Sequence, residues 1–127
     1  MPLEYPFATE LDNVKRTPLF DQHVSDASTI INLKGFARAM HYRGHVAEHK
    51  ATREGVTLCD VSHMGEVDFV GRDALALVQK VATNDASKLA VSQAMYSVMC
   101  AQDGTIIDDL VCFRLGENHF RWVVNVT

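Results

Sequence analysis

The sequence of 127 residues predicts an α+β fold in which helices flank an antiparallel β-meander. Three observations predict it. Residues 94–126 contain two turn signals, at 103–104 and 116–118, between segments rich in β-branched and aromatic residues. Residues 73–82 carry apolar side chains at helical spacing. Strand and helix signals are interspersed without the regular rhythm of a parallel βαβ protein.

The first half of the chain predicts short elements. Residues 19–24 favour a turn of helix. Residues 28–36 mix β-branched side chains with a glycine, which predicts a short strand that ends at Gly35. Residues 45–53 are rich in helix formers, so we expect a short helix that stops at Gly55.

The second half is more regular. Val67 and Phe69 alternate with acidic residues, which is the period of a half-buried strand. The helix predicted at residues 73–82 has Leu75 and Val78 on one stripe. The three strands of the meander are predicted at residues 94–102, 105–115 and 119–126.

Composition excludes several classes of protein. The net charge is -4 and no run of Lys or Arg is present, so nucleic acid is not an expected partner. No apolar stretch approaches the roughly 18 residues that a membrane span needs, and no secretory or transit signal is evident. Three cysteines without C-x-x-C spacing favour a reducing compartment. We expect an N-terminal arm at residues 1–14 and one domain over 15–127, in the cytoplasm or, in a eukaryote, the mitochondrial matrix.

The middle strand of the meander carries the main candidate, Asp109, next to Asp108. Adjacent strand residues point to opposite faces, so the two carboxylates should not act as one pair. Each is expected among apolar side chains, where a carboxylate needs partners or its pKa rises. Such a group is typical of an active site, and a turn-proximal carboxylate held by backbone donors is the alternative.

Strand register places partners around Asp109. A two-residue loop at 103–104 puts Val98 opposite Asp109 and leaves Tyr96 as a diagonal neighbour on the same face. A three-residue loop at 116–118 puts Asn125 opposite Asp109. The register therefore predicts Tyr96, Asp109 and Asn125 on one face, and a slip of one residue would break this arrangement.

Two other patterns are weaker. His45, Glu48 and His49 fit the H-x-x-E-H pattern of inverted zinc metalloproteases, in which two imidazoles one turn apart hold zinc. The pattern is short and no third ligand is placed on another element, so we expect a solvated helix face and no metal site. Ser62 beside His63 is not a catalytic dyad, because neighbours on a strand face apart.

Several ordered motifs resemble the glycine cleavage T-protein (aminomethyltransferase) family. Residues 59–65, Cys-Asp-Val-Ser-His-Met-Gly, resemble the family's Phe-Asp-Val-Ser-His-Met-Gly signature. Residues 104–110 resemble its catalytic-aspartate strand, and residues 123–125 resemble the strand that follows. Shorter matches in the family's order lie at residues 16–20, 84–85, 87–89 and 93–96.

The resemblance implies that residues 15–127 are the N-terminal part of a folate-binding domain in an enzyme of one-carbon metabolism. Members of this family transfer an aminomethyl group from the lipoyl arm of a carrier protein to N5 of tetrahydrofolate and release ammonia. The residue matching Asp109 contacts the pterin and assists proton handling. The residues matching Met64, Tyr96 and Asn125 line the folate site.

The departures concern the substrate and the length. Phe113, which we count among the folate-binding candidates, replaces a tyrosine of the family; Ala39 replaces a proline, Cys59 a phenylalanine, and residues 34–36 an Ala-Gly-Trp run. Family members continue well past this point, so the resemblance implies an incomplete enzyme that associates with a second chain or as a homo-oligomer. The alternatives are a non-catalytic folate-binding or regulatory module and a folate-dependent demethylase subunit.

Overall fold

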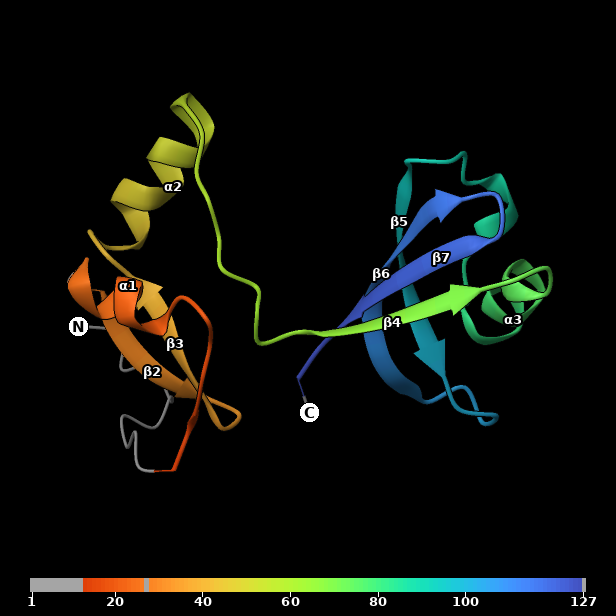
Figure 1. Ribbon diagram of the computed structural model, residues 1–127, viewed down its shortest axis with the longest axis horizontal. Helices are drawn as coiled ribbons and strands as arrows, with labels where there is room; N and C mark the ends of the chain where they lie inside the picture. The colour runs from red at the N-terminus through yellow and green to blue at the C-terminus, as the bar shows by residue number, and fades with distance from the viewer. Residues whose placement is uncertain (1–12, 27, 127) are drawn as a thin grey trace. The chain divides into compact units, whose positions relative to one another are not determined.

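The structure is a computed structural model that describes residues 13–26 and 28–126 (Figure 1). It divides into two compact units, Met1–His63 and Met64–Thr127. Residues 1–12 of the predicted N-terminal arm lie outside the described residues, and the predicted domain boundary at residue 15 stays a prediction. Across the described part of the chain, no helix combines the length and the apolar character that crossing a membrane requires.

The first unit is built on a three-stranded sheet in the order β1-β3-β2 (Figure 1). β1 (Lys15–Arg16) pairs in parallel with β3 (Phe36–His41), and β3 pairs antiparallel with β2 (Thr29–Leu33). The unit also contains α1 (Phe20–Ser25) and α2 (His45–Glu54), which confirm the two short helices predicted there.

β2 confirms the strand predicted at residues 28–36, but β3 has no counterpart among the predicted strands. The two strands are joined at Lys34 and Gly35, whose φ angles are 49° and 84°. Asn32 Oδ1 accepts the backbone N–H of Gly35 at 2.9 Å and closes this turn. β3 lacks a strong strand signal because alanines fill its inward positions, although Ala37 is only 1% exposed.

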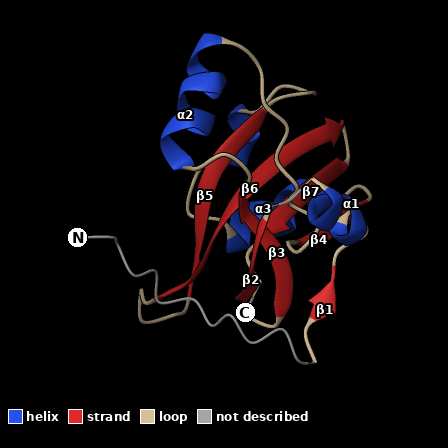
Figure 2. Cartoon of the chain, turned by 90° about the vertical axis from the view of Figure 1, so that its left-hand side faces the viewer, coloured by secondary structure: helices blue, strands red, loops and turns tan. Residues whose placement is uncertain are grey.

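The second unit contains a four-stranded antiparallel sheet in the order β4-β7-β6-β5. Its strands are β4 (Gly65–Val70), β5 (Ala94–Cys100), β6 (Ile106–Gly116) and β7 (His119–Val124). Figure 2 shows β5, β6 and β7 side by side, in red. They form the predicted meander, and β4 extends the sheet at β7. The α+β class and the predicted helix, here α3 (Ala74–Val81), are confirmed.

One face of this sheet packs against α3 and the 3-10 turn η1 (Ala86–Lys88). The buried cluster consists of Ala74, Val78, Ala82, Ala86, Leu89, Leu110, Cys112, Phe120 and Trp122. We call the opposite side of the sheet the open face; its residues include Tyr96, Val98, Asp109, Val111, Phe113 and Val123. Strand alternation explains this division, because each residue directed into the core has neighbours directed away from it.

The β5–β6 hairpin has a longer loop than predicted. The backbone N–H of Ala101 donates to the carbonyl of Thr105 at 2.8 Å, so the loop has three residues, 102–104, and not two. A bulge between Met99 and Cys100 then shifts the ladder back by one position. Beyond this bulge Val98 pairs with Asp109, as the sequence predicts.

The β6–β7 hairpin shows the converse. Gly116 pairs with His119, so the loop has two residues and not the predicted three. A register shift between Arg114 and Gly116 compensates, and Arg114 pairs with Phe120. The predicted register is therefore correct beyond both hairpins, although both predicted loop lengths are wrong by one residue.

Candidate functional site

The second sheet brings three predicted site residues together on the open face. Asp109 on β6 pairs with Val98 on β5, and Tyr96 is a diagonal neighbour on the same face. The ladder between β6 and β7 ends one pair before Asp109, so Asn125 follows opposite it. The strand register confirms the predicted placement of these residues; their roles stay predictions.

Two side-chain donors hold the Asp109 carboxylate. The Tyr96 hydroxyl donates to Oδ2, and Asn125 Nδ2 donates to Oδ1 at 2.9 Å. The bond to Asp109 raises the pKa of Tyr96, and desolvation and the nearby carboxylates act in the same direction. Tyr96 therefore stays protonated at neutral pH as a donor, while its side chain, 62% exposed, remains accessible on the open face.

Asp108 also binds Asn125, which the alternation rule does not predict. Asn125 Nδ2 lies 2.9 Å from Asp108 Oδ1, and the backbone N–H of Asn125 lies 3.1 Å from Asp108 Oδ2. The register keeps the two aspartates on opposite faces, as expected, but both carboxylates bind the same amide nitrogen at the end of the sheet. Asn125 lies just past the last residue of β7, where regular pairing has ended and its side chain can reach both.

Met64 lies at the same end of the sheet. Gly65 pairs with Val124, so Met64 follows opposite Asn125 and is half-buried. A Cβ on Gly65 would lie 2.9 Å from Cγ2 of Val124, which is too close for any larger residue without a shift of β4 or β7. This close approach explains a glycine directly after Met64. Met64, just before β4, Asn125, just after β7, and Asp109 of β6 thus lie in one row at this end of the sheet.

Phe113 lies on the open face but apart from this row. It is four residues along β6 from Asp109, a separation of about 13 Å at the usual rise of a strand. Phe113 pairs with Arg121 of β7, whose guanidinium donates two hydrogen bonds of 2.9 Å to the Asp68 carboxylate. The structure therefore gathers Met64, Tyr96, Asp109 and Asn125, and does not bring Phe113 to them.

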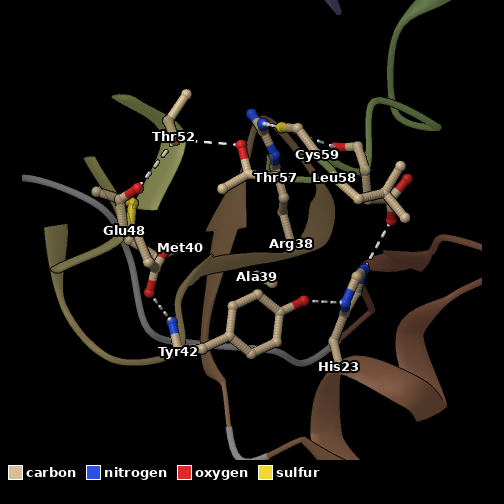
Figure 3. A pocket seen from close by; sticks show the side chains of 11 residues that line it. His23, Arg38, Ala39, Met40, Tyr42, Glu48, Thr52, Thr57, Leu58 and Cys59 are labelled. Atoms are coloured by element: carbon tan, nitrogen blue, oxygen red, sulfur yellow. Dashed lines mark hydrogen bonds and ion pairs between the residues drawn. The ribbon is translucent and has the colours of Figure 1, made fainter. Parts of the chain in front are cut away.

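The first unit contains a separate polar network that sequence reasoning did not find. Asp60 Oδ2 lies 2.7 Å from His23 Nε2, and His23 Nδ1 lies 2.5 Å from the Tyr42 hydroxyl. Thr17 donates to Asp60 at 3.1 Å. Figure 3 shows Tyr42 directed at His23 beside a pocket of about 390 Å³. These residues come from separate elements and share no local pattern, so no sequence signal marks them.

Hydrogen bonding dominates the electrostatics of this network. Burial alone would raise the pKa of Asp60, but bonds from His23, Ser62 and Thr17 outweigh it and hold the pKa well below its usual range. The side chains of His23 and Asp60 are 7% and 8% exposed. Because Asp60 already serves donors from its own unit, we interpret the network as structural and place the candidate site around the exposed Asp109.

Neighbouring groups in the first unit also have structural partners. Arg38 lies 3.1 Å from His63 Nε2, and burial, followed by the charge of Arg38, lowers the pKa of His63. Glu48 Oε1 accepts the backbone N–H groups of Tyr42 and Arg43 at 2.6 and 2.7 Å. Glu48 thus closes the turn before α2, which is a different role from the base of the metalloprotease pattern. Within residues 13–26 and 28–126, no three His, Cys, Asp or Glu side chains converge as a metal site does.

Fold and site together define an α+β protein with a carboxylate cluster on the open face of its second sheet. Comparison with known protein families identifies the protein more specifically. The sequence model of the family described as the GCVT N-terminal domain matches residues 19–127. The chain belongs to this family. The resemblance found in the motifs is thereby confirmed.

Individual relatives agree. The chain is 42% identical over 114 residues to an aminomethyltransferase of Symbiobacterium thermophilum, covering 90% of this chain and 30% of the relative. It is 42% identical over 117 residues to one of Desulfitobacterium hafniense, covering 92% and 32%. A crystal structure of the glycine cleavage system aminomethyltransferase T from Bartonella henselae matches with a TM-score of 0.75 and 27% identity, covering 88% of this chain and 31% of that one. The chain thus spans about a third of the length of these relatives.

Proposed function

We propose that this chain provides the Asp109 side of the tetrahydrofolate site in an enzyme that transfers an aminomethyl group. The observation that carries the proposal is the cluster on the open face, where a tyrosine hydroxyl and an asparagine amide hold one exposed carboxylate. Membership of the GCVT N-terminal domain family supports it. So do relatives named aminomethyltransferase.

The residues around Asp109 suit a reduced pterin. Tyr96, Val98 and Val111 give the open face apolar surface on which a flat ring can lie. Asp109 offers acceptor lone pairs to ring N–H groups, because each of its oxygens has one described donor and room for another. No cationic side chain contacts Asp109 among the described residues, so a neutral or positively charged group suits it better than an anion.

Tetrahydrofolate, when bound, supplies the nitrogen that receives the one-carbon unit. Asp109 orients the N–H group of that nitrogen by accepting its hydrogen bond. It also stabilises positive charge that develops near it. A unit charge about 4 Å away gains about 1 kcal/mol in bulk water and about 4 kcal/mol at the effective dielectric constant near a protein surface. Tyr96 and Asn125 keep the carboxylate in place for both tasks.

The donor and partners follow from the same proposal. We infer that the one-carbon unit arrives as an aminomethyl group on the lipoyl arm of a carrier protein. The match to a glycine cleavage system aminomethyltransferase supports this donor over that of a demethylase. Large apolar side chains such as Ile106, Ile107 and Leu115 are 62%, 58% and 44% exposed in the second unit, which favours association with further polypeptide.

Calorimetric titration of tetrahydrofolate into the chain tests the proposal. We expect saturable binding that Asp109→Asn weakens about 10- to 150-fold, because a hydrogen bond to a charged group contributes about 1.5–3 kcal/mol. Asp73→Asn is the matched control, since Asp73 lies on the surface beside Arg72 and receives the same change of charge. The proposal fails if the wild-type chain does not bind, or if Asp109→Asn binds as tightly as the control.

A further inference from the structure

We propose that Asp108 is a positioning residue that orients the Asn125 side-chain amide, so that the amide oxygen faces the ligand. Asp108 needs no contact with the ligand to do this. The orientation of the amide follows from hydrogen bonds within the chain, whereas its consequence for the ligand rests on the proposed function.

The nitrogen of the Asn125 amide is surrounded by acceptors. Nδ2 lies 2.9 Å from Oδ1 of Asp108, 2.9 Å from Oδ1 of Asp109 and 3.0 Å from the backbone oxygen of Asp109. Ionised carboxylates accept hydrogen bonds and cannot donate them. Rotating the amide by half a turn would replace these bonds with contacts between oxygens. The nitrogen end must therefore face the two aspartates.

Asp108 differs from Asp109 in that it binds both the side chain and the backbone N–H of Asn125. Its second oxygen accepts the backbone N–H of Asn125 at 3.1 Å, so it holds the main chain and the side chain of one residue at once. Asp108 is also the more buried of the two carboxylates. Asp109 is shared with Tyr96 and, under the proposed function, with the ligand. Asp108 has no such competing partner among the described residues.

The amide oxygen is left as an acceptor. No described residue donates to Asn125 Oδ1, and this oxygen faces away from both carboxylates because the nitrogen faces toward them. Together with Asp109 it gives the site two adjacent acceptors. Such a site selects a ring whose facing edge carries N–H donors. Tetrahydrofolate has N–H groups where fully oxidised folic acid has ring nitrogens that only accept, so Asp108 favours the reduced ligand.

Titrations of tetrahydrofolate and of folic acid test this selectivity. Asp108→Asn replaces one of the acceptors of Asn125 Nδ2 with an amide that can itself turn, while the Asp109 acceptors remain. The preference for the original amide orientation is therefore weaker, and the turned orientation, which offers N–H to the oxidised ring, becomes more populated. We expect the dissociation constant of folic acid divided by that of tetrahydrofolate to fall at least fivefold in Asp108→Asn. The same ratio should stay unchanged in Asp73→Asn. If both affinities fall by the same factor, Asp108 is merely structural and the inference is overturned. An unchanged ratio overturns it too.

Nuclear magnetic resonance of the ligand-free chain tests the amide directly, independently of any folate. The side-chain amide protons of Asn125 should exchange with solvent at least tenfold more slowly than those of Asn118, an exposed turn residue. Equal exchange rates in the wild-type chain overturn the inference even if Asp108→Asn fails to fold. Slow exchange that becomes faster in Asp108→Asn, without tetrahydrofolate binding, would instead leave Asp108 in its role and reject the proposed function.

Discussion

Asp60→Ala should destabilise the first unit far more than Asp60→Asn. The two Asp60 oxygens accept four bonds, from His23 and Thr17 on one oxygen and from the backbone N–H and hydroxyl of Ser62 on the other. Asparagine can keep the Ser62 bonds on its oxygen and donate its amide N–H to His23, provided that the imidazole takes its other tautomer. Tyr42 then accepts from His23 and no longer donates. Alanine leaves every donor without its acceptor.

The magnitudes follow from these partners. A charged hydrogen bond contributes about 1.5–3 kcal/mol and a neutral one about 0.5–1.5 kcal/mol, so Asp60→Asn should cost about 1–1.5 kcal/mol at the buried bond to His23. The bonds from Ser62 are exposed and add little. Asp60→Ala should cost about 3–5 kcal/mol, because Thr17 and His23 are buried and their donors would lose their partners away from water. Few apolar residues of this unit are buried, Ile31 and Ala37 among them, so either loss is a large part of its stability.

Amide hydrogen exchange measures the stability of the first unit separately from that of the second. Protection of β2 and β3 reports on the first unit, whereas the fluorescence of the one tryptophan, Trp122, reports on the second. We expect protection in β2 and β3 to fall in the order wild type, Asp60→Asn, Asp60→Ala, with the Trp122 signal unchanged. Equal loss in the two variants, or a loss spread over both units, would refute the reasoning.

The role of Asp60 also predicts how the stability of the first unit depends on pH. The folded pKa of Asp60 lies below its usual value, so the carboxylate stabilises the fold above the ordinary carboxyl pKa of about 4. This stability is lost as pH falls from there through the lower folded pKa. The wild-type first unit should therefore lose protection below about pH 4. In Asp60→Asn this dependence should flatten.

Two further substitutions test the second unit. Gly65→Ala should destabilise the second unit by about 1–3 kcal/mol, since the added methyl group would lie 2.9 Å from Cγ2 of Val124. Urea unfolding followed by Trp122 fluorescence measures this loss of stability. An unchanged unfolding midpoint would contradict the pairing of β4 with β7. Phe113→Tyr, which introduces the tyrosine that the sequence resemblance implies, should change tetrahydrofolate affinity by less than about threefold, because Phe113 is about 13 Å along β6 from Asp109. A tenfold gain by calorimetry would place Phe113 in the site after all.

The sequence predicts the second unit well because the residue patterns that specify its strands, helix and turns are local. Alternation in β4, the apolar stripe of α3 and the turn signals between the meander strands lie within a few residues of the elements that they specify. The register that brings Tyr96, Asp109 and Asn125 together follows from these turns. Loop lengths are predicted less well, because bulges next to the turns are not marked in the sequence.

The first unit is predicted less completely because its information is distant. His23 and Asp60 are separated by 37 residues, and His23 and Tyr42 by 19, so no periodic pattern links them. The role of Asp108 is hidden for a related reason. Alternation holds only while β6 and β7 are paired, and the side chain of Asn125 crosses to both aspartates just beyond the last pair.

The two bulges of β6 have a consequence for how this chain can be altered. One lies next to each hairpin. Between them Asp108 to Phe113 keep an uninterrupted ladder with β5, and Leu110 to Arg114 keep one with β7. A residue gained or lost in either loop can be absorbed at the adjacent bulge, where one more or one fewer residue already fits. Insertions, reporter tags or new recognition loops can thus be introduced at the two hairpin tips, while Asp109 stays aligned with its neighbours on the adjacent strands.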